Sequence, residues 1–195
     1  MTAPNRSLYT CAMGMEPDQR LIGLVGLACA RVTLALALLT GCGWLAAATA
    51  QTRSISKFGE WAVYAHDEAS GRICFASTPP RASDPPQDTG FKPLLFVSAW
   101  PREGVRAEVS VKTAAPLKPG GGGTIIVDKV SFKLAANGDR AYVMDSTEEL
   151  KLLEAMKKGS SVIVVAQTEQ GVVAKDTYSL AGITQALQAI TAACK

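Results

Sequence analysis

His66 is the only histidine of this 195-residue chain, and it stands beside Asp67 and Glu68. A histidine next to a carboxylate can act in general base catalysis, but only when a nucleophile or substrate lies within hydrogen-bond reach. Adjacency in the sequence gives no evidence of such a group, and His66 falls at the exposed end of an expected hairpin. We therefore interpret His66 as a solvated position near a turn.

The other chemical motifs are either absent or explained by structure. No serine lies in a G-x-S-x-G nucleophile elbow. The run from Gly120 to Gly123 lacks the Lys and Ser or Thr of a phosphate loop, so we predict a flexible hairpin turn there. Glu148 and Glu149 suit the first turn of a helix, where negative charge is favoured. The sequence thus offers no catalytic motif and no cofactor-binding motif.

Asp176 and Tyr178 form a more informative pair, because aspartate is depleted in strand interiors and both side chains fall on one face of a predicted strand. One interpretation is structural: a buried Asp176 accepts hydrogen bonds from backbone or tyrosine groups, and Tyr178 buries its ring while its hydroxyl finds a partner. The other is that the pair serves a hydrolase or isomerase. We favour the structural interpretation, in which the pair holds the last strand against the final helix.

Residues 1–50 have the pattern of an export signal. Arg31 precedes the apolar run 32–39, and Ala48-Thr49-Ala50 supplies the small residues that a signal peptidase accepts before Gln51. The segment is long for such a signal, and a translation start at Met13 or Met15 would bring it closer to the usual length. We expect residues 1–50 to be a signal peptide and residues 51–195 to form a single β-rich domain.

Two alternatives for the leader remain open. Residues 21–50 are long enough to span a bilayer, although Arg31 in their midst counts against a membrane anchor. The run 39–42 resembles a lipobox ending at Cys42, but apolar residues follow where a polar tether is expected. Cleavage after Ala50 is the favoured prediction, and it places the mature protein in the periplasm or the medium, with a lipoprotein through Cys42 as the minor alternative.

Removal of the leader leaves two cysteines, Cys74 and Cys194. In an oxidising compartment they most simply form one disulfide, which in the chain-entropy model contributes about 4 to 5 kcal/mol for a loop of this length. Two free thiols are the alternative. A metal site is disfavoured, because two distant cysteines and His66 lack the clustered spacing of zinc ligands.

The bulk charge excludes one class of partner. The formal net charge of the chain is only +3, and no basic stripe marks a nucleic-acid-binding surface. The residues beyond the leader suffice for one domain with a hydrophobic core.

The elements that must position these residues are mostly short strands separated by turns, which predicts an antiparallel β-sandwich or barrel-like domain with two short helices. Strands are expected at 58–65, 72–77, 91–100, 105–112, 124–128, 130–134, 140–144, 161–168 and 172–178. The proline-rich run 79–88 is predicted to be a surface loop.

The first helix is expected to begin with a capping box at Ser146, to bury Leu150, Leu153 and Met156, and to end at a left-handed Gly159. In the second, Ile183, Leu187 and Ile190 share the face that packs on the sheet, with Cys194 one turn further on.

Several blocks, in this order and spacing, resemble the invasion-associated locus B family of bacterial envelope proteins. They are Gly59-Glu60-Trp61-Ala62-Val63-Tyr64, Cys74-Phe75-Ala76, Val105-Arg106-Ala107-Glu108-Val109-Ser110, and Asp176-Thr177-Tyr178-Ser179-Leu180 followed by a helix and Cys194. The chain departs from the family pattern at Ala107, at Ala114-Ala115 and in the glycine run. The resemblance implies an exported β-rich domain of a family implicated in host-cell invasion, and it carries no catalytic residues.

The sequence therefore predicts an exported, non-catalytic domain that binds a protein, a glycan or an envelope component, with peripheral association with the outer membrane as a further possibility and no nucleic acid as partner. The alternative is a cell-envelope hydrolase or isomerase that uses acidic residues such as Asp176 with Tyr178. A flat face rich in Tyr, Trp and Arg would favour the binding protein. A concave pocket with converging carboxylates would favour the enzyme.

Overall fold

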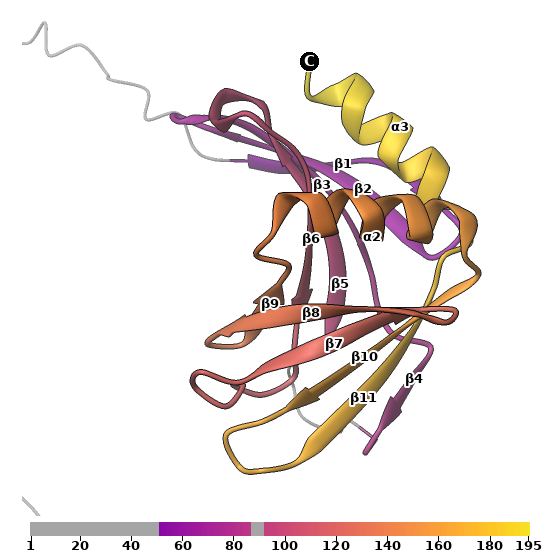
Figure 1. The fold of residues 1–195 in the computed structure, drawn as a ribbon. Helices are drawn as coiled ribbons and strands as arrows, with labels where there is room; N and C mark the ends of the chain where they lie inside the picture. Colours follow the sequence, from indigo (N-terminus) through magenta and orange to yellow (C-terminus); the bar gives the residue numbers. More distant parts are fainter. Residues whose placement is uncertain (1–50, 87–91) are drawn as a thin grey trace, which may run out of the picture. The chain divides into compact units, whose positions relative to one another are not determined.

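The computed structural model describes residues 51–86 and 92–195. The predicted signal segment, with Cys42 and the proposed cleavage site at Ala48 and Ala50, lies outside the described residues. Within these residues, eleven strands form one antiparallel sheet in the order β1-β2-β3-β5-β6-β9-β8-β7-β10-β11-β4, accompanied by two α-helices (Figure 1). The sheet stays open because β1 and β4 occupy its two ends. The prediction of a mainly β, antiparallel fold with two helices is confirmed.

The strands of the first half of the sheet are β1 (Gln51–Phe58), β2 (Trp61–Glu68), β3 (Gly71–Thr78), β5 (Leu94–Trp100) and β6 (Val105–Lys112). A short 3-10 helix, η1 (Pro101–Glu103), connects β5 to β6. The second half contains β9 (Arg140–Tyr142), β8 (Val130–Asn137), β7 (Gly122–Val127), β10 (Ser161–Gln167), β11 (Val173–Ser179) and β4 (Ala82–Asp84). The three-residue strand β9 joins the halves by pairing with β6 and β8.

Helix α2 (Ser146–Lys158) lies against β6, β7 and β8, and helix α3 (Ile183–Ala193) lies along β1, β2, β3 and β5 (Figure 1). Strand alternation places one side chain in two towards the helices. The core therefore collects fully buried residues from both halves, among them Trp61, Val97, Ile125 and Leu152. No helix in the described part of the chain is long and apolar enough to cross a membrane.

The first predicted strand, 58–65, was misplaced. Phe58 ends β1, and the chain turns through Gly59, whose φ is +60°, before β2 begins at Trp61. Strand β1 escaped prediction because it is an edge strand that is exposed along most of its length, so its sequence carries no apolar alternation.

The predicted loop 79–88 contains a strand. Residues Ala82–Asp84 form β4, which pairs with β11 at the end of the sheet. Prolines on either side, Pro80 and Pro85, are compatible with an edge strand of only three residues, because an edge strand leaves one side of its backbone unpaired.

The glycine run is also more ordered than predicted. Gly120 takes a left-handed conformation in the turn, but Gly122 and Gly123 belong to β7 and pair with β8. A Cβ on Gly122 would overlap the carbonyl oxygen of Leu134, and one on Gly123 would lie 2.7 Å from the carbonyl oxygen of Val165. These glycines are needed for the close approach of neighbouring strands.

Helix α2 differs from its prediction at both ends. Its N-cap is Asp145, whose side chain accepts a hydrogen bond from the backbone N–H of Glu148 at 2.9 Å, so the predicted box at Ser146 is not used. Gly159 ends the helix in an extended conformation, with φ of −82°, not in the left-handed one. Leu150 is 65% exposed and Leu152 is buried in its place. In α3, by contrast, Ile183 and Ile190 are buried as predicted, and Leu187 packs at the edge of the core.

Candidate functional site

Asp176 lies in the middle of β11, between β10 and β4, and is 3% exposed. Its Oδ1 accepts a hydrogen bond from the hydroxyl of Ser83 on β4 at 2.5 Å. Burial raises the pKa of the Asp176 carboxyl above its usual value, and the bond from Ser83 partly offsets that rise. Asp176 therefore holds the edge strand β4, which was not predicted. The predicted role, in which Asp176 holds the last strand against the final helix, differs from this contact.

Tyr178 follows two residues later on the same face and is fully buried. Its hydroxyl has no hydrogen-bond partner among the described residues, which differs from the predicted bond. Burial, and then the negative charge of Asp176, raise the pKa of this hydroxyl far above its usual value. The end of β11 is held instead by Trp61, whose Nε1 donates to the carbonyl oxygen of Ser179 at 3.0 Å. In this conformation Tyr178 is sealed away from solutes.

His66 and Asp67 are not brought together, because neighbouring side chains of a strand point to opposite faces. His66 Nδ1 lies 2.7 Å from the hydroxyl of Thr52, and its Nε2 lies 3.0 Å from Glu68. Asp67 instead pairs with Arg72 at 2.6 Å on the other face, and this bond lowers the pKa of the exposed Asp67 carboxyl. Both ring nitrogens of His66 are thus engaged on the protein's surface.

Cys74 and Cys194 form a disulfide, with their Cα atoms 5.9 Å apart. The bridge attaches the C-terminal end of α3 to β3. Arg72 lies beside it and donates to the carbonyl oxygen of Ala193 at 3.4 Å, where the helix presents unpaired carbonyl groups. The bridge and this contact together fix the last helix on the sheet.

A row of aromatic rings crosses β2, β3 and β5. Tyr64 stacks on Phe75 with ring centroids 5.2 Å apart, and Phe75 lies 6.1 Å from Phe96 at a tilted angle. The guanidinium of Arg140, from β9, lies 5.4 Å from the centroid of Phe96. These four side chains form one continuous row. We use the name aromatic face for this row and the half-buried residues Ile73, Leu94 and Tyr142 beside it.

The aromatic face is separate from the hydrophobic core. The three rings alternate along their strands with core residues such as Val63, Ala76 and Val97, so they point to the opposite side of the sheet. They remain half-buried and are not part of the core cluster. In the part of the chain that the structure describes, neither helix packs against this side of the rings. Apolar side chains gathered on a surface are characteristic of interaction sites, and this makes the aromatic face a candidate.

A hollow of about 560 Å³ continues the aromatic face towards β1. Tyr64, Pro79 and Pro80 line it, together with the small side chains of Ala62 and Ser77, which pair across β2 and β3. At the rim, Arg81 pairs with Glu60 at 3.0 Å. The site thus combines an aromatic row with an adjoining depression.

Two carboxylates border the aromatic face on the β6 side. Burial raises the pKa of Glu108, while the charge of Arg140 opposes the rise. Burial also raises the pKa of Glu149, from α2. Glu149 accepts a hydrogen bond from the backbone N–H of Val109 at 2.9 Å, beyond the point where β6 pairs with the short strand β9. Glu149 therefore satisfies a strand edge, which is a structural use of the carboxylate.

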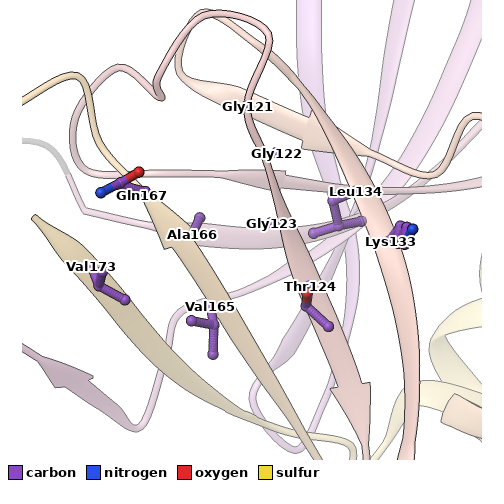
Figure 2. Close-up of a pocket in the computed structure, with 10 residues that line it drawn as sticks. All are labelled: Gly121, Gly122, Gly123, Thr124, Lys133, Leu134, Val165, Ala166, Gln167 and Val173. Atoms are coloured by element: carbon purple, nitrogen blue, oxygen red, sulfur yellow. The ribbon is translucent and has the colours of Figure 1, made fainter. Parts of the chain in front are cut away.

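A second hollow, of about 540 Å³, lies over the glycines of β7 (Figure 2). Its floor is backbone at Gly122 and Gly123, and Val165 and Val173 line one side (Figure 2). Lys133 is the one ionisable group among its lining residues. Because the glycines are already required by strand packing, the hollow needs no ligand to explain it. Among the described residues, no cluster of three or more His, Cys, Asp or Glu side chains could hold a metal ion.

Sequence reasoning identified Asp176, Tyr178 and the cysteines but missed the aromatic face. Its signal was present: Tyr64, Phe75 and Phe96 all fall on predicted strands, at positions that alternate with core residues. A search of the predicted strands for aromatic residues on the side facing away from the core would have identified the aromatic face.

The fold and its surface define a class: an antiparallel β domain with a disulfide-fixed C-terminal helix and a half-buried aromatic face on the side of the sheet away from the core. No protein-family model and no curated protein matches the sequence. The fold is similar to the crystal structure of invasion associated protein B from Bartonella henselae, with a TM-score of 0.50 and 14% sequence identity over 72% of this chain and 97% of that chain. At that identity the similarity shows a shared fold.

Proposed function

We propose that this protein is an exported, non-catalytic binding domain of the invasion-associated locus B type, and that it binds its partner through the aromatic face. The observation that carries the proposal is the row of Tyr64, Phe75 and Phe96 capped by Arg140. Tyrosine, phenylalanine and arginine are enriched in protein interfaces, and aromatic anchors dominate binding energy. Support for the family comes from the fold shared with invasion associated protein B and from the sequence blocks that resemble the family.

The arrangement of the rings favours a protein over a glycan as partner. A sugar binds an aromatic residue by lying on the open face of its ring. Tyr64 and Phe75 cover one another at an interplanar angle of 24°, and Arg140 lies over Phe96. Within the row, ring edges and a cation face a partner and suit apolar side chains and carbonyl groups of a polypeptide, while Tyr64 also lines the adjoining hollow.

The enzyme alternative has less support from the site. Asp176 is 3% exposed and Tyr178 is fully buried, so neither is positioned to contact an envelope substrate. The other two carboxylates with raised pKa, Glu108 and Glu149, lie at the strand edge, where Glu149 accepts a hydrogen bond from a backbone N–H.

We further propose that the chain is exported to the periplasm or the medium, with cleavage after Ala50 and peripheral contact with the envelope through its partner. The support is the apolar run 32–39 followed by small residues before Gln51. Intact-mass measurement of the exported protein tests this directly. We expect a chain that begins at or near Gln51, whereas an acylated Cys42 or a retained leader would refute it.

The binding role can be tested with a photo-crosslinking residue placed at Phe75 in the producing bacterium and, in parallel, in protein applied to host cells. The matched control places the same residue at Val173, which is 57% exposed and lies in the other half of the sheet. We expect one discrete adduct from position 75 and none from position 173. Phe75→Ala, with Val173→Ala as control, should weaken binding of the captured partner by about 2 kcal/mol, the loss typical of an interface hot spot. Equal crosslinking at both positions, or unchanged affinity, would refute the proposal.

A further inference from the structure

Two exposed cations flank the aromatic rings without an ion-pair partner. Lys57 lies on the edge strand β1, and Arg140 lies on β9 with its guanidinium 5.4 Å from the centroid of the Phe96 ring. Both side chains are exposed, and in the part of the chain that the structure describes neither takes part in an ion pair. Unpaired cations beside an apolar surface favour a partner that carries negative charge.

The strand register joins these two cations through one line of side chains. Lys57 of β1 pairs with Ala62 of β2, and Ala62 pairs with Ser77 of β3. Ser77 in turn pairs with Phe96 of β5. Residues directly opposite one another in an antiparallel pair lie on the same face, so this line crosses the aromatic side of the sheet. We call the line, with Arg140 at its end, the cross-strand track.

The middle of the cross-strand track is a hollow. The small side chains of Ala62 and Ser77 line the depression of about 560 Å³ described above, together with Tyr64 and Leu94. Lys57 is itself one of its lining residues. An apolar side chain of a partner that enters the hollow therefore contacts Tyr64 and Leu94, between the cation of β1 and the ring that carries the other cation.

The spacing along the cross-strand track matches an extended polypeptide. Strands β1 and β5 are three positions apart in the sheet order, which corresponds to about 14 Å at the usual spacing between strands. An extended chain advances about 3.4 Å per residue, so about four residue steps separate the groups that reach Lys57 and Arg140. Because side chains of an extended chain alternate in direction, the first, third and fifth residues of such a segment face the sheet. The third residue then lies over the hollow, midway between the two cations.

The acidic residues near the cross-strand track leave its two cations available to a partner. Glu60, which also lines the hollow, pairs with Arg81 at 3.0 Å. Glu108 of β6 feels the charge of Arg140 but makes no ion pair with it among the described contacts. A basic segment would be repelled at both ends of the track, whereas an acidic one is attracted at both.

We propose that the aromatic face selects an extended polypeptide segment in which an acidic, an apolar and a second acidic residue occupy alternate positions; this inference rests on the binding role proposed above. The first carboxylate pairs with Lys57, the apolar side chain enters the hollow, and the second carboxylate pairs with Arg140. A guanidinium that lies over a ring keeps the N–H groups at its edge free to bind a carboxylate.

The test is an NMR titration of the isotope-labelled exported protein with synthetic peptides. Each is a capped, threonine-rich peptide with a central leucine, and the residues two positions before and after the leucine are both aspartate, both asparagine or both lysine. We expect the aspartate peptide to shift the backbone amides of Ala62 and Ser77 and to bind about tenfold more tightly than the asparagine peptide, and the lysine peptide not to bind. A fourth peptide, with both aspartates moved next to the leucine, should bind as weakly as the asparagine peptide.

Charge reversal on the protein provides the matching change. Lys57→Glu and Arg140→Glu should each raise the dissociation constant for the aspartate peptide about tenfold, and the double variant should prefer the lysine peptide. Lys175→Glu, on exposed β11 in the other half of the sheet, is the matched control and should change nothing. Circular dichroism melting checks that each variant is folded, and Lys57→Glu, on an exposed edge strand, tests the proposal without disturbing the contact between Arg140 and Phe96.

Equal binding of the aspartate and lysine peptides, or an affinity that charge reversal leaves unchanged, would refute the proposal. The absence of any shift at about 1 mM aspartate peptide would also refute it. A protein that binds phosphatidylglycerol vesicles but not the aspartate peptide would have a lipid partner, which contradicts the proposal. The binding role is judged separately: a partner crosslinked at position 75 whose affinity ignores both charge reversals refutes this inference alone, whereas the lack of any adduct refutes the binding role.

Discussion

The buried hydroxyl of Tyr178 gives the sharpest test of how β11 is held. Its side chain is fully buried, and its oxygen has no hydrogen-bond partner among the described residues. A buried hydroxyl without a partner costs about 1 to 3 kcal/mol by protein mutational data. Tyr178→Phe removes that oxygen and keeps the ring, so the core stays filled. We therefore expect the free energy of unfolding to rise by about 1 to 2 kcal/mol.

The matched control is Trp61→Phe, at a second fully buried aromatic residue of the same core. Its Nε1 donates to the carbonyl oxygen of Ser179, so its removal leaves that carbonyl unpaired and also shrinks the side chain. We expect a loss of about 2 to 4 kcal/mol, from the unpaired acceptor and the cavity together. Urea unfolding measures both changes, and for a domain of this size 1 kcal/mol corresponds to about 2 to 4 °C in Tm.

A loss of 1 kcal/mol or more in Tyr178→Phe would refute this reasoning, because it would mean that the hydroxyl has a partner, such as a water molecule bridging to Asp176. From the sequence alone we would have expected such a loss, because a buried tyrosine usually bonds its hydroxyl. The structure reverses the sign. A variant of unchanged stability that lost turnover of an envelope substrate would instead support the enzyme alternative.

Three further outcomes follow from the described contacts. Burial raises the pKa of Glu149 above its usual value, so its contribution to stability is present below its unfolded pKa and is lost as the pH rises through its folded pKa. Wild-type protein should therefore lose stability relative to Glu149→Gln as the pH rises above the usual pKa of a glutamate, as pH-resolved urea unfolding would show. Reduction of the Cys74–Cys194 bridge should lower the free energy of unfolding by about 4 to 5 kcal/mol, and Cys194→Ser should unfold identically with and without reductant. Gly122→Ala should cost about 2 kcal/mol or more in the same assay, because its Cβ would overlap the Leu134 carbonyl oxygen.

The sequence was most informative where apolar alternation and turn residues agree. The hairpin of β10 and β11 was predicted to within a residue at every end, because β10 is rich in valine and isoleucine and Gly171 takes the left-handed turn conformation. Helix α3 was predicted for the same reason, since Ile183 and Ile190 recur at helical spacing. The spacing of apolar residues within one segment is enough to predict an element that packs directly on the core.

The features that escaped prediction depend on neighbours distant in the chain. Strand β4 exists because β11 offers it a free edge, and nothing in its three residues shows this. Gly122 is a strand residue because Leu134 approaches it, not because glycine favours strands. The N-cap of α2 is Asp145 and not Ser146, and both residue types are favourable at that position. In each case several local conformations were available, and tertiary contacts selected one.

The candidate site shows the same division between local and distant information. That Tyr64, Phe75 and Phe96 face away from the core follows from alternation within each strand. That the three form one row follows from the strand register. Tyr64 of β2 lies opposite Phe75 of β3. On the next strand, β5, Phe75 lies opposite Ser98, which is two residues from Phe96 and therefore on the same face. Arg140 joins the row only because β9 pairs with β6 and bridges the two halves of the sheet. The aromatic face is therefore a property of strand order, and a substitution that shifted the register of β9 would remove its cation without touching any aromatic residue.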